Sequence, residues 1–393
     1  MKLYRNLALA VVHGLGEIFT GNRHADRIVE KLLKQDPRWG SRDRKFVAET
    51  IYDIIRWRKL FEACAGSGEW ELFACWLIRH NIDLPSWPEM DGCDVKKIKE
   101  KLGAPHSRAT RESIPDWMDE IGQQSLGAGW EKELAALNQT APVTLRCNTL
   151  KVTRRELADA LLSEGFETTA SHDFPDALHL NKRANVFRTQ AFRDGLFEVQ
   201  DAGSQEIAPF CRAEAGMRII DACAGGGGKT LHLAAITGNK GRIIALDTED
   251  WKLQELKKRA RRAGISTIET RVITDRKVIK RLQGQADRLL LDVPCSGMGV
   301  LKRNPDAKWK LTPESIAGTV RLQEEILDEY PLMLKPGGEM VYATCSILPQ
   351  ENENQIRRFL EIHKEFQLLE EKHLLPSGGT DGFYMARLRK NIS

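Results

Sequence analysis

Several sequence patterns that define large protein classes are missing from this chain. Its 393 residues include eight cysteines, but none form a Cys-x-x-Cys pair, and no histidine cluster completes the spacing of a zinc site. No apolar run approaches the length needed to span a bilayer, and the chain has no internal repeat and no low-complexity segment. The sequence therefore argues against a zinc-binding protein, a membrane-spanning protein and a repeat protein.

The cysteine content does not indicate a secreted disulfide-rich protein, and the net charge does not by itself indicate a nucleic-acid-binding protein. Eight cysteines are too few for a secreted disulfide scaffold of this length, so we expect free thiols in a reducing, cytoplasmic setting. The N-terminal stretch AVVHGLG is interrupted by His13 and two glycines, which favours a first helix over a targeting signal. The net charge of +4 permits a nucleic-acid partner without requiring one.

Length and composition indicate a globular protein of two or three domains. Hydrophobic residues make up 41% of the chain and charged residues 29%. Residues 1–130 carry apolar side chains at the i, i+3, i+4 spacing and are predicted to be helical. Residues 131–199 are predicted to form a small mixed α/β element, whose helix is capped at Thr153. Residues 200–393 are predicted to form a third domain.

The third domain alternates short apolar runs with helical stretches. Runs of this length between helices are typical of a parallel sheet covered on both faces, which is a doubly wound α/β fold. In such folds ligands bind at the carboxyl ends of the strands. The predicted strands are RIIDAC (218–223), RIIALD (242–247), ETRVIT (269–274), RLLLDV (288–293) and GEMVYATC (338–345).

A glycine-rich loop, DACAGGGGKT (221–230), follows the first of these strands and opens a helix. Glycines let the backbone approach a ligand closely, and a helix N-terminus attracts negative charge. A phosphate-binding P-loop is excluded because Cys223 stands where that motif needs glycine. A dinucleotide fingerprint is excluded because it would end on Thr230 or Leu231. The cofactor that remains is S-adenosylmethionine, which needs a tight glycine turn but no phosphate cradle.

Two aspartates end the next two strands. Asp247 ends RIIALD, about 20 residues after the glycines, where a carboxylate can bind a ribose diol. Asp275 follows the third strand, where it suits either a contact near the adenine amino group or an ordinary helix N-cap. Spacing alone does not decide between these two roles of Asp275.

Two thiols follow the last two strands, in LLLDVPCSGMG (289–299) and MVYATCSILPQEN (340–352). Both loops open at the same edge of a doubly wound sheet, so we expect Cys295 and Cys345 to converge at the reactive end of the cofactor. The remaining cysteines are expected to be inert or to have no chemistry of their own, as buried cysteines usually are. They are Cys64, Cys75, Cys93, Cys147, Cys211 and Cys223.

A methyltransferase whose acceptor is a carbon atom can use two thiols, one as a nucleophile and one as a proton acceptor. C5 of a pyrimidine has no lone pair, but a thiolate that adds to C6 makes C5 nucleophilic. The C5 proton must then leave, which calls for a general base. Spacing leaves open which cysteine has which role. Asp292 is placed to bind N3 and the exocyclic amine of the base, and Lys229 to add positive charge or to hold Asp292.

With these motifs, the chain resembles the RNA (cytosine-5)-methyltransferases of the RsmB and NSUN kind, and RsmB most closely. The resemblance covers nearly the whole chain. It rests on DACAGGGGKT, DVPCSGMGVLKRNPDAKW and YATCSILPQENENQI, with further matches in LRCNTLK, FEVQDAGSQ and TDGFYMARL. It implies a Rossmann-like class I methyltransferase domain, preceded by a helical NusB-like RNA-binding domain and the small α/β element.

The resemblance also implies the roles of individual residues. Cys345 is implied to attack C6, and Cys295 to assist release by removing the C5 proton. Where the family commonly has Ala-Pro, this chain has Gly225-Gly226, so its loop should be more flexible and lose more entropy on ordering. The implied cofactor contacts are Cys223, Ala224, Gly225, Gly226, Gly227, Gly228, Lys229, Asp247, Asp275 and Asp292.

The implied substrate is small-subunit (16S) ribosomal RNA, bound as a single strand so that the cytosine can leave its stack. We expect a monomer that binds neither a membrane nor a metal. The run KKRARR (257–262) is interpreted as a solvated helix face. Two alternatives are the same chemistry on transfer RNA and an inert RNA-binding assembly factor, although intact thiols argue against the second. The predicted RNA contacts beyond Cys295 are Lys302, Arg303, Lys308 and Trp309.

Overall fold

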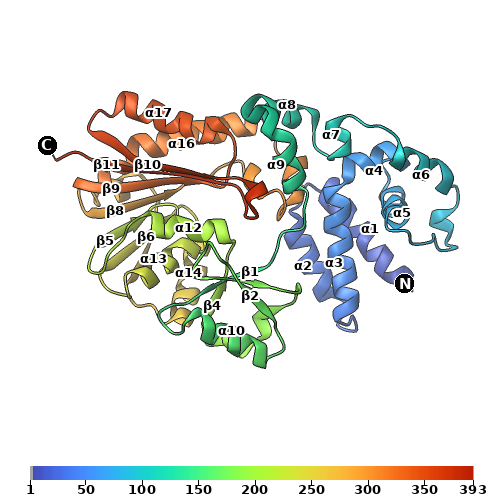
Figure 1. The fold of residues 1–393 in the computed structure, drawn as a ribbon, viewed down its shortest axis with the longest axis horizontal. Coiled ribbons are helices and arrows are strands. Elements are labelled where there is room, and N and C mark those ends of the chain that lie inside the picture. The colour runs from blue at the N-terminus through green and yellow to red at the C-terminus, as the bar shows by residue number, and fades with distance from the viewer. Residues whose placement is uncertain (1–2, 393) are drawn as a thin grey trace. The chain divides into compact units, whose positions relative to one another are not determined.

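The computed structural model describes residues 3–392, which fold into two compact units (Figure 1). The helical unit comprises Met1–Gln139 and Leu301–Pro313, and the α/β unit comprises Thr140–Val300 and Glu314–Ser393. The three-domain division predicted at residues 130 and 199 stays a prediction. Within residues 3–392, no helix combines the length and the apolar character needed to cross a membrane.

The helical unit is built from amphipathic helices, as the i, i+3, i+4 spacing predicted. Helix α2, for example, buries Ile28, Val29 and Leu32 and turns its charged side chains outward. The buried faces form one apolar core. The helices are α1 (Arg5–Phe19), α2 (Ala25–Gln35), α3 (Ser41–Arg56), α4 (Arg58–Ala65), α5 (Glu69–Arg79), α6 (Val95–Gly103), α7 (Arg108–Arg111), α8 (Asp116–Leu126) and α9 (Trp130–Leu137).

The segment Leu301–Pro313 supplies part of the interior of the helical unit. Lys308 has no exposed surface, and its Nζ, when protonated, donates hydrogen bonds to Arg56 O, Ser113 O and Asn138 Oδ1. Trp309 Nε1 donates to Ile55 O at 2.8 Å. The RNA contact predicted for Lys308 is therefore wrong, because its side chain is buried in the protein interior. Trp309 is half-buried, and its RNA contact stays a prediction.

Lys302 is also buried, at 5% exposure, so its predicted RNA contact is wrong as well. Its carbonyl accepts a hydrogen bond from Arg56 Nη2 at 2.9 Å. Arg303 is half-buried, and its RNA contact stays a prediction. The basic residues after Cys295 looked like a surface loop because a lysine is seldom fully buried.

Buried Lys308 should make the stability of the helical unit depend on pH. Burial and the nearby Arg56 guanidinium lower the pKa of Lys308 from 10.5 to about 7. Between those values the unfolded chain holds a proton that the folded chain lacks, so stability rises with pH; below about pH 7 both states are protonated and the slope vanishes. We expect the free energy of unfolding to rise by up to about 1.4 kcal/mol per pH unit between about pH 7 and 8.5.

Denaturant unfolding followed by tryptophan fluorescence can test this slope, because eight of the nine tryptophans belong to the helical unit. Lys308→Met should remove the slope, whatever its effect on overall stability. Lys132→Met, which changes an exposed lysine of the same unit, should preserve it. An equal slope in wild type and Lys308→Met would contradict the account of a neutral buried amine.

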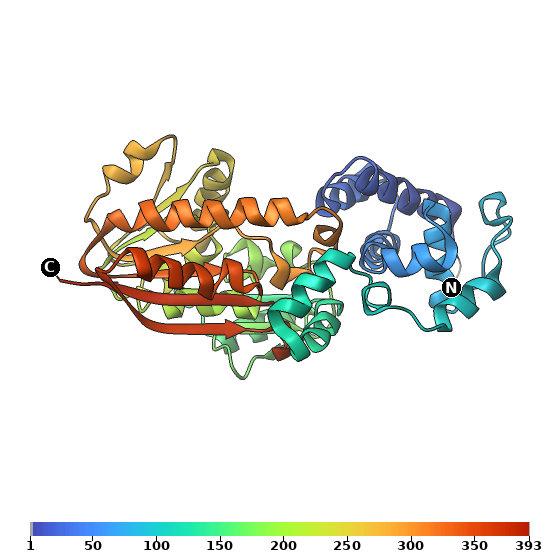
Figure 2. The ribbon, with the colours of Figure 1, turned by 90° about the horizontal axis from the view of Figure 1, so that it is seen from above.

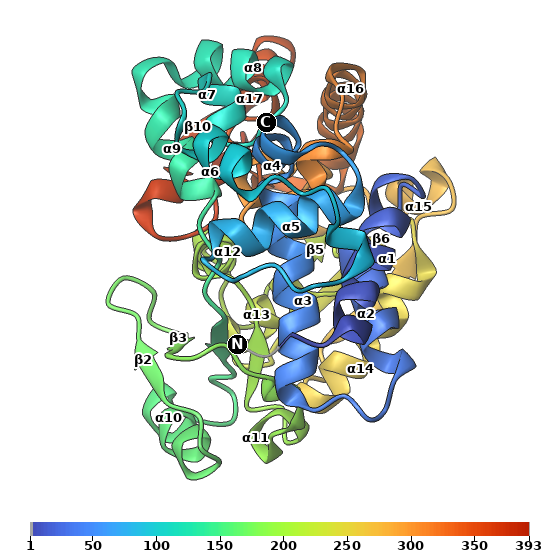
Figure 3. The same cartoon turned by 90° about the vertical axis from the view of Figure 1, so that its right-hand side faces the viewer.

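The first part of the α/β unit is a small antiparallel sheet in the order β2-β3-β1-β4. Helix α10 (Arg154–Ser163) packs on it (Figure 3), with Leu157 and Leu161 against Leu178 of the sheet. The predicted cap is confirmed, since Thr153 Oγ1 accepts from Glu156 N and Glu156 accepts from Thr153 N. The strands are β1 (Thr144–Cys147), β2 (Thr168–Ala170), β3 (Ala177–Leu180) and β4 (Phe197–Val199).

The large sheet of the α/β unit has the order β10-β11-β9-β8-β5-β6-β7. Strands β5 to β9 are parallel, and each lies at a run predicted from the sequence. The chain passes from β5 to β6 and β7 on one side and then returns to β8 and β9 on the other. Their bounds are β5 (Arg218–Asp221), β6 (Arg242–Asp247), β7 (Ile268–Val272), β8 (Ala286–Asp292) and β9 (Leu334–Thr344).

Helices cover both faces of the large sheet, which confirms the doubly wound fold. One face packs on α12 (Ala202–Phe210), α13 (Gly228–Ile236) and α14 (Asp250–Ala263). The other packs on α15 (Arg276–Lys280), α16 (Pro313–Glu329) and α17 (Glu353–Ile362). Figure 2 shows α16, in orange, running along the sheet.

Two antiparallel strands complete the sheet beyond β9, and the sequence reasoning did not predict them. They are β10 (Phe366–Leu374) and β11 (Phe383–Lys390). Strand β10 lies at the edge and contains Glu370, Glu371 and Lys372, so it lacks the apolar run of an inner strand. Because the middle of β10 is charged, a search for hydrophobic runs does not detect this strand.

Candidate functional site

The parallel strands bring the predicted site residues to one edge of the large sheet. Strands β5 to β9 all end there, so the loops after Asp221, Asp247 and Asp292 open on the same side, as does the loop that contains Cys345. The chain reverses its winding direction between β5 and β8, which is where ligands bind in such sheets.

The glycine loop makes a sharp turn between β5 and α13. Gly225 and Gly227 have φ angles of 54° and 82°, in the left-handed region that favours glycine. A Cβ on Gly227 would come within 2.4 Å of Leu256 Cγ, so α14 packs directly against the loop. A Cβ on Gly225 would meet nothing within 4 Å, so this side of the loop is open to a ligand.

The aspartate at the end of β6 is tied to the glycine loop. Asp247 Oδ2 accepts from Gly225 N at 2.9 Å, and Oδ1 accepts from Glu249 N at 2.9 Å. Asp275, in contrast, is exposed and accepts from Lys277 N at 2.7 Å as the N-cap of α15. The capping role of Asp275 is therefore observed, and its contact with adenine stays a prediction.

Lys229 and Asp292 form an ion pair across the β5–β8 boundary. Lys229 Nζ lies 2.5 Å from Asp292 Oδ2, and the side chains are 16% and 25% exposed. Burial works against the charge of Lys229, but the charge and hydrogen bond of Asp292 outweigh it and raise the pKa of the lysine. The negative charge of a Cys345 thiolate makes a smaller contribution to the same rise.

The two predicted thiols meet. Cys295 Sγ and Cys345 Sγ lie 3.2 Å apart, and Cys345 N donates to Cys295 Sγ at 3.3 Å. The hydrogen bond with Cys345, burial and the charge of a Cys345 thiolate hold the pKa of Cys295 well above its usual range. Cys295 is therefore a neutral thiol next to Cys345, and the pair can share a proton.

Glycine in CSGMG allows the two cysteine loops to touch. Gly299 N donates to Cys345 O at 2.9 Å, and Gly382 N donates to Gly299 O at 2.8 Å. A Cβ on Gly299 would come within 2.2 Å of Gly382 O and 2.8 Å of Cys345 O. Any side chain at position 299 would therefore push the loop of Cys295 away from Cys345.

A buried carboxylate, which the sequence reasoning did not select, joins the two cysteine loops. Glu351 has no exposed surface and accepts from Ser296 N at 2.7 Å and from Ser296 Oγ at 2.5 Å. Gln323 Nε2 donates to the same carboxylate at 3.3 Å and to Pro294 O at 2.9 Å. Position alone could have suggested Glu351, because it follows Cys345 in the polar stretch PQENEN.

A second missed residue is Asp221, at the end of β5. Thr230 Oγ1 donates to Asp221 Oδ2 at 2.7 Å, which ties the strand to helix α13 on the far side of the glycine loop. Burial raises the pKa of Asp221 to about 7. The signal in the sequence was that Asp221, a polar residue, ends the short apolar run of this strand.

The other cysteines have no such setting. All eight are free, and Cys64, Cys75, Cys147 and Cys211 are buried. Burial raises the pKa of Cys75 to about 12, in keeping with the inert role predicted for it. Within residues 3–392, no cluster of His, Cys, Asp and Glu side chains could hold a metal ion.

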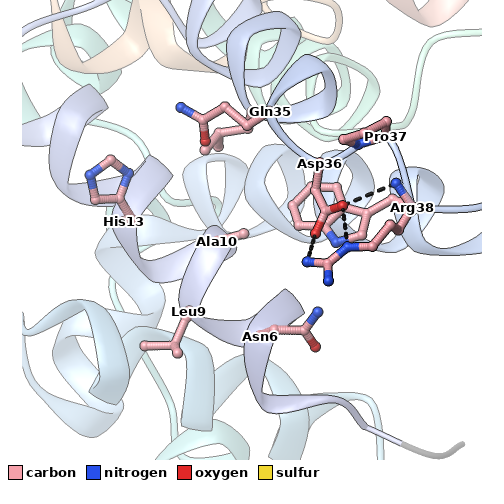
Figure 4. Close-up of a pocket in the computed structure, with 10 residues that line it drawn as sticks. Asn6, Leu9, Ala10, His13, Gln35, Asp36, Pro37 and Arg38 are labelled. Atoms are coloured by element: carbon pink, nitrogen blue, oxygen red, sulfur yellow. Dashed lines mark hydrogen bonds and ion pairs between the residues drawn. The ribbon is translucent and has the colours of Figure 1, made fainter.

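A hollow of about 650 Å³ lies on the helical unit, between α1 and the turn after α2 (Figure 4). Asn6, His13 and Gln35 line it, and the Asp36–Arg38 ion pair lies at one side. It contains none of the predicted catalytic or cofactor-binding residues. The thiol pair of the α/β unit is therefore the candidate active site.

Two family models match the chain. Residues 211–389 match the family described as 16S rRNA methyltransferase RsmB/F, and residues 114–187 match the ferredoxin-like domain of RsmF/B-like methyltransferases. The first match spans the glycine loop, Asp247, Asp292 and both cysteine motifs. The second overlaps the small antiparallel sheet.

Curated relatives and a solved structure extend the match. The probable ribosomal RNA small subunit methyltransferase B of Synechocystis is 36% identical over 298 residues, 71% of this chain and 67% of the relative. The ribosomal RNA small subunit methyltransferase B of Vibrio cholerae is 37% identical over 310 residues, 77% and 69% of the two chains. The crystal structure of the protein PH0851 is 25% identical, covers 99% of this chain and 100% of that one, and has a TM-score of 0.85. The chain therefore belongs to the RsmB/F family of 16S rRNA methyltransferases.

Proposed function

We propose that this protein methylates C5 of a cytosine in small-subunit (16S) ribosomal RNA through a transient bond between Cys345 and C6 of the base. As an RsmB/F family member, the chain is an S-adenosylmethionine-dependent RNA (cytosine-5)-methyltransferase. The observation that carries the covalent route is the 3.2 Å approach of the Cys295 and Cys345 sulfur atoms. A methyltransferase for oxygen or nitrogen acceptors has no use for this pair.

In the first step, Cys345 acts as the nucleophile. Its thiolate adds to C6, the C5–C6 double bond opens, and C5 becomes electron-rich. Asp292 accepts a hydrogen bond from the exocyclic amine of the cytosine and orients the ring. Lys229 holds Asp292, and its positive charge favours a thiolate at Cys345. The positive charge of Lys229 stabilises the negative charge that develops on the ring during addition.

In the last step, Cys295 acts as the base. It removes the C5 proton, the electrons of that C–H bond re-form the C5–C6 double bond, and the C6–sulfur bond breaks to release Cys345 as a thiolate. The main cause of the raised pKa of Cys295 is its hydrogen bond with Cys345. That cause weakens once the Cys345 sulfur is a thioether, so in the adduct Cys295 releases its own proton to solvent and becomes the thiolate that accepts the C5 proton.

The glycine loop and the strand-end carboxylates fit S-adenosylmethionine. The open space beside Gly225 admits a ligand, and the Asp247 carboxylate lies next to it, where it can accept from a ribose diol. When bound, the cofactor supplies the methyl group. Residues 223–229 and Asp292 line the same edge, and Asp275 is the outermost of the proposed contacts.

The proposal includes the substrate class, the cellular location and the oligomeric state of the enzyme. RNA is the substrate, and we place the enzyme in the cytoplasm as a monomer. The contact between the two thiols and the Lys229–Asp292 ion pair support an enzyme over an inert assembly factor, which would need neither. Transfer RNA is the other candidate substrate, and the family description favours ribosomal RNA.

Bisulfite sequencing of ribosomal RNA from a strain that lacks this protein tests the assignment. A cytosine of the small-subunit RNA should lose its protection, and wild type but not Cys345→Ala should restore it. Unchanged protection throughout the small-subunit RNA, together with loss of protection in a transfer RNA, would contradict the proposed substrate.

Glu351 should matter for rate because it holds the Cys295 loop against the Cys345 loop. Glu351→Gln replaces one acceptor oxygen with a donor facing the Ser296 N–H and hydroxyl groups. We expect methyl transfer to fall about 10- to 100-fold, the size of effect that a small displacement of reacting groups produces. Single-turnover assays with radiolabelled cofactor measure this loss directly.

The matched control for Glu351 is Glu361→Gln, which alters an exposed glutamate of helix α17. Its rate should equal that of wild type. Circular dichroism should show both variants folded at the assay temperature. A folded Glu351→Gln variant with the wild-type rate would show that this carboxylate does not position the thiols.

A further inference from the structure

An arginine behind the glycine loop holds it in place. Arg259, on α14, donates from Nη1 to Gly226 O at 2.6 Å. The remaining nitrogens of the same guanidinium bind Glu198 Oε2, at 3.2 Å from Nε and 3.0 Å from Nη2. The side chain therefore connects the loop to β4 of the small sheet by three hydrogen bonds.

Both carboxylate oxygens of Glu198 accept hydrogen bonds from arginine side chains. Glu198 is 5% exposed, and its second oxygen, Oε1, accepts from Arg262 Nη2 at 2.5 Å. The Arg262 guanidinium in turn lies 3.9 Å from the centre of the Phe192 ring. A carboxylate bound by two guanidinium groups and packed beside a ring has little freedom, so it fixes the position of Arg259.

This arrangement corrects the interpretation of KKRARR as a solvated face. Lys257, Lys258 and Arg261 are exposed, as expected. Arg259 and Arg262 have side chains only 19% and 22% exposed and point to Glu198. The periodicity of the helix explains the difference, because positions 259 and 262 lie on its inner side, next to buried Leu256, Ala260 and Ala263.

Other contacts hold the loop at neighbouring positions. Leu256, one turn before Arg259 on α14, packs against Gly227, where a Cβ would clash at 2.4 Å. Arg146, on β1 of the small sheet, is buried and donates from Nη1 to Gly228 O at 2.5 Å. Gly225 N donates a hydrogen bond to Asp247 Oδ2. Each glycine of the loop thus has a fixed neighbour.

We propose that Arg259, held by Glu198, is a positioning residue that pre-organises the glycine loop for the cofactor. Four consecutive glycines have more conformations to lose on ordering than Ala-Pro in the same place. A hydrogen bond to Gly226 O from a fixed guanidinium orders the loop before the cofactor arrives, and this lowers the entropy lost on binding. The inference rests on the proposed binding of S-adenosylmethionine at this loop.

Isothermal titration calorimetry with S-adenosylmethionine tests the inference on three variants of the full chain. Arg259→Ala should raise the Kd about 10-fold, the worth of one charge-assisted hydrogen bond. Glu198→Gln, which keeps the shape of the side chain but loses its charge, should raise it in the same direction by a smaller factor. Arg261→Ala removes an exposed arginine from the same helix and should leave the Kd unchanged.

A second substitution separates ordering of the loop from simple packing. A Cβ at Gly226 would lie 3.2 Å from Arg259 Nη1, so Arg259→Ala makes room for it, and the φ of Gly226 is outside the left-handed region. Gly226→Ala in the Arg259→Ala background should recover part of the affinity by stiffening the loop. At saturating cofactor, kcat of Arg259→Ala should equal that of wild type.

Three results would overturn the inference: an unchanged Kd in both Arg259→Ala and Glu198→Gln, a loss that Gly226→Ala does not recover, or a kcat that falls at saturating cofactor. Asp247→Ala separates these failures from a failure of the proposed site. If Asp247→Ala weakens binding and Arg259→Ala does not, the cofactor binds here without the help of Arg259. If neither variant weakens binding, the cofactor site itself is misplaced.

Discussion

Replacing Cys295 with alanine is expected to trap a covalent complex between the protein and its RNA. In this variant Cys345 can still add to C6 and the methyl group can still be transferred. No group then removes the C5 proton, because Cys295 Sγ is the sulfur that lies 3.2 Å from Cys345 Sγ. Release of Cys345 is blocked, and the adduct accumulates to nearly one per active site. A slowly migrating band on a denaturing gel reports it.

The trap has a clear control and a clear contrary outcome. The double variant Cys295→Ala/Cys345→Ala should give no band, because it lacks the nucleophile. The band should also require S-adenosylmethionine to reach its full intensity, since only a methylated C5 needs the base for release. If Cys295→Ala turned over normally with no adduct, Cys295 would not be the release group.

Replacing Cys345 with alanine is expected to abolish methyl transfer. Without the sulfur of Cys345, the proposed route has no nucleophile for C6, and C5 remains a weak nucleophile. We expect the rate to fall by at least about 10⁴-fold, the scale seen when an enzyme loses its nucleophile. Transfer of a radiolabelled methyl group into RNA measures this loss.

Binding should survive the loss of Cys345. The cofactor contacts proposed at Asp247 and the glycine loop do not involve this thiol, so the Kd for S-adenosylmethionine should change little. Cys93→Ala, which alters a half-buried cysteine of the helical unit, should keep wild-type activity. Substantial methylation by a Cys345→Ala protein would require a different nucleophile.

Much of the α/β unit could be predicted because its signals are local. Each parallel strand is a short apolar run, and each functional loop follows such a run. The rule that parallel strands end at one edge then predicts that Cys295 and Cys345 meet, which they do. The predicted contact between Lys229 and Asp292 follows from the same rule. The assignment of roles to the two thiols came from the family resemblance.

The missed features depend on contacts between residues far apart in the chain. Lys308 looks like a surface residue in sequence, yet its amine binds acceptors on Arg56, Ser113 and Asn138. Glu351 looks like one of several acidic residues near a helix start until the fold brings Ser296 to it. Burial of a charged group is decided by its distant partners, and the local pattern does not report them.

The glycine loop likewise has one feature that the sequence predicts and one that depends on distant residues. Its turn was predictable because glycine adopts the positive φ angles found at Gly225 and Gly227 without steric cost. The support of the loop was not predictable, because Arg259, on helix α14, and Glu198, on strand β4 of the small sheet, are 61 residues apart. The basic run that contains Arg259 is also ambiguous, since its side chains alternate between solvent and interior.

Mass spectrometry of the trapped complex tests the central claim most directly. The Cys295→Ala protein is incubated with substrate RNA and S-adenosylmethionine, then digested with nuclease and protease. The account predicts one modified peptide, which carries a methylated cytosine nucleotide on the sulfur of Cys345. A nucleotide attached to any other residue, or an unmodified Cys345 in a sample that contains methylated RNA, would contradict it.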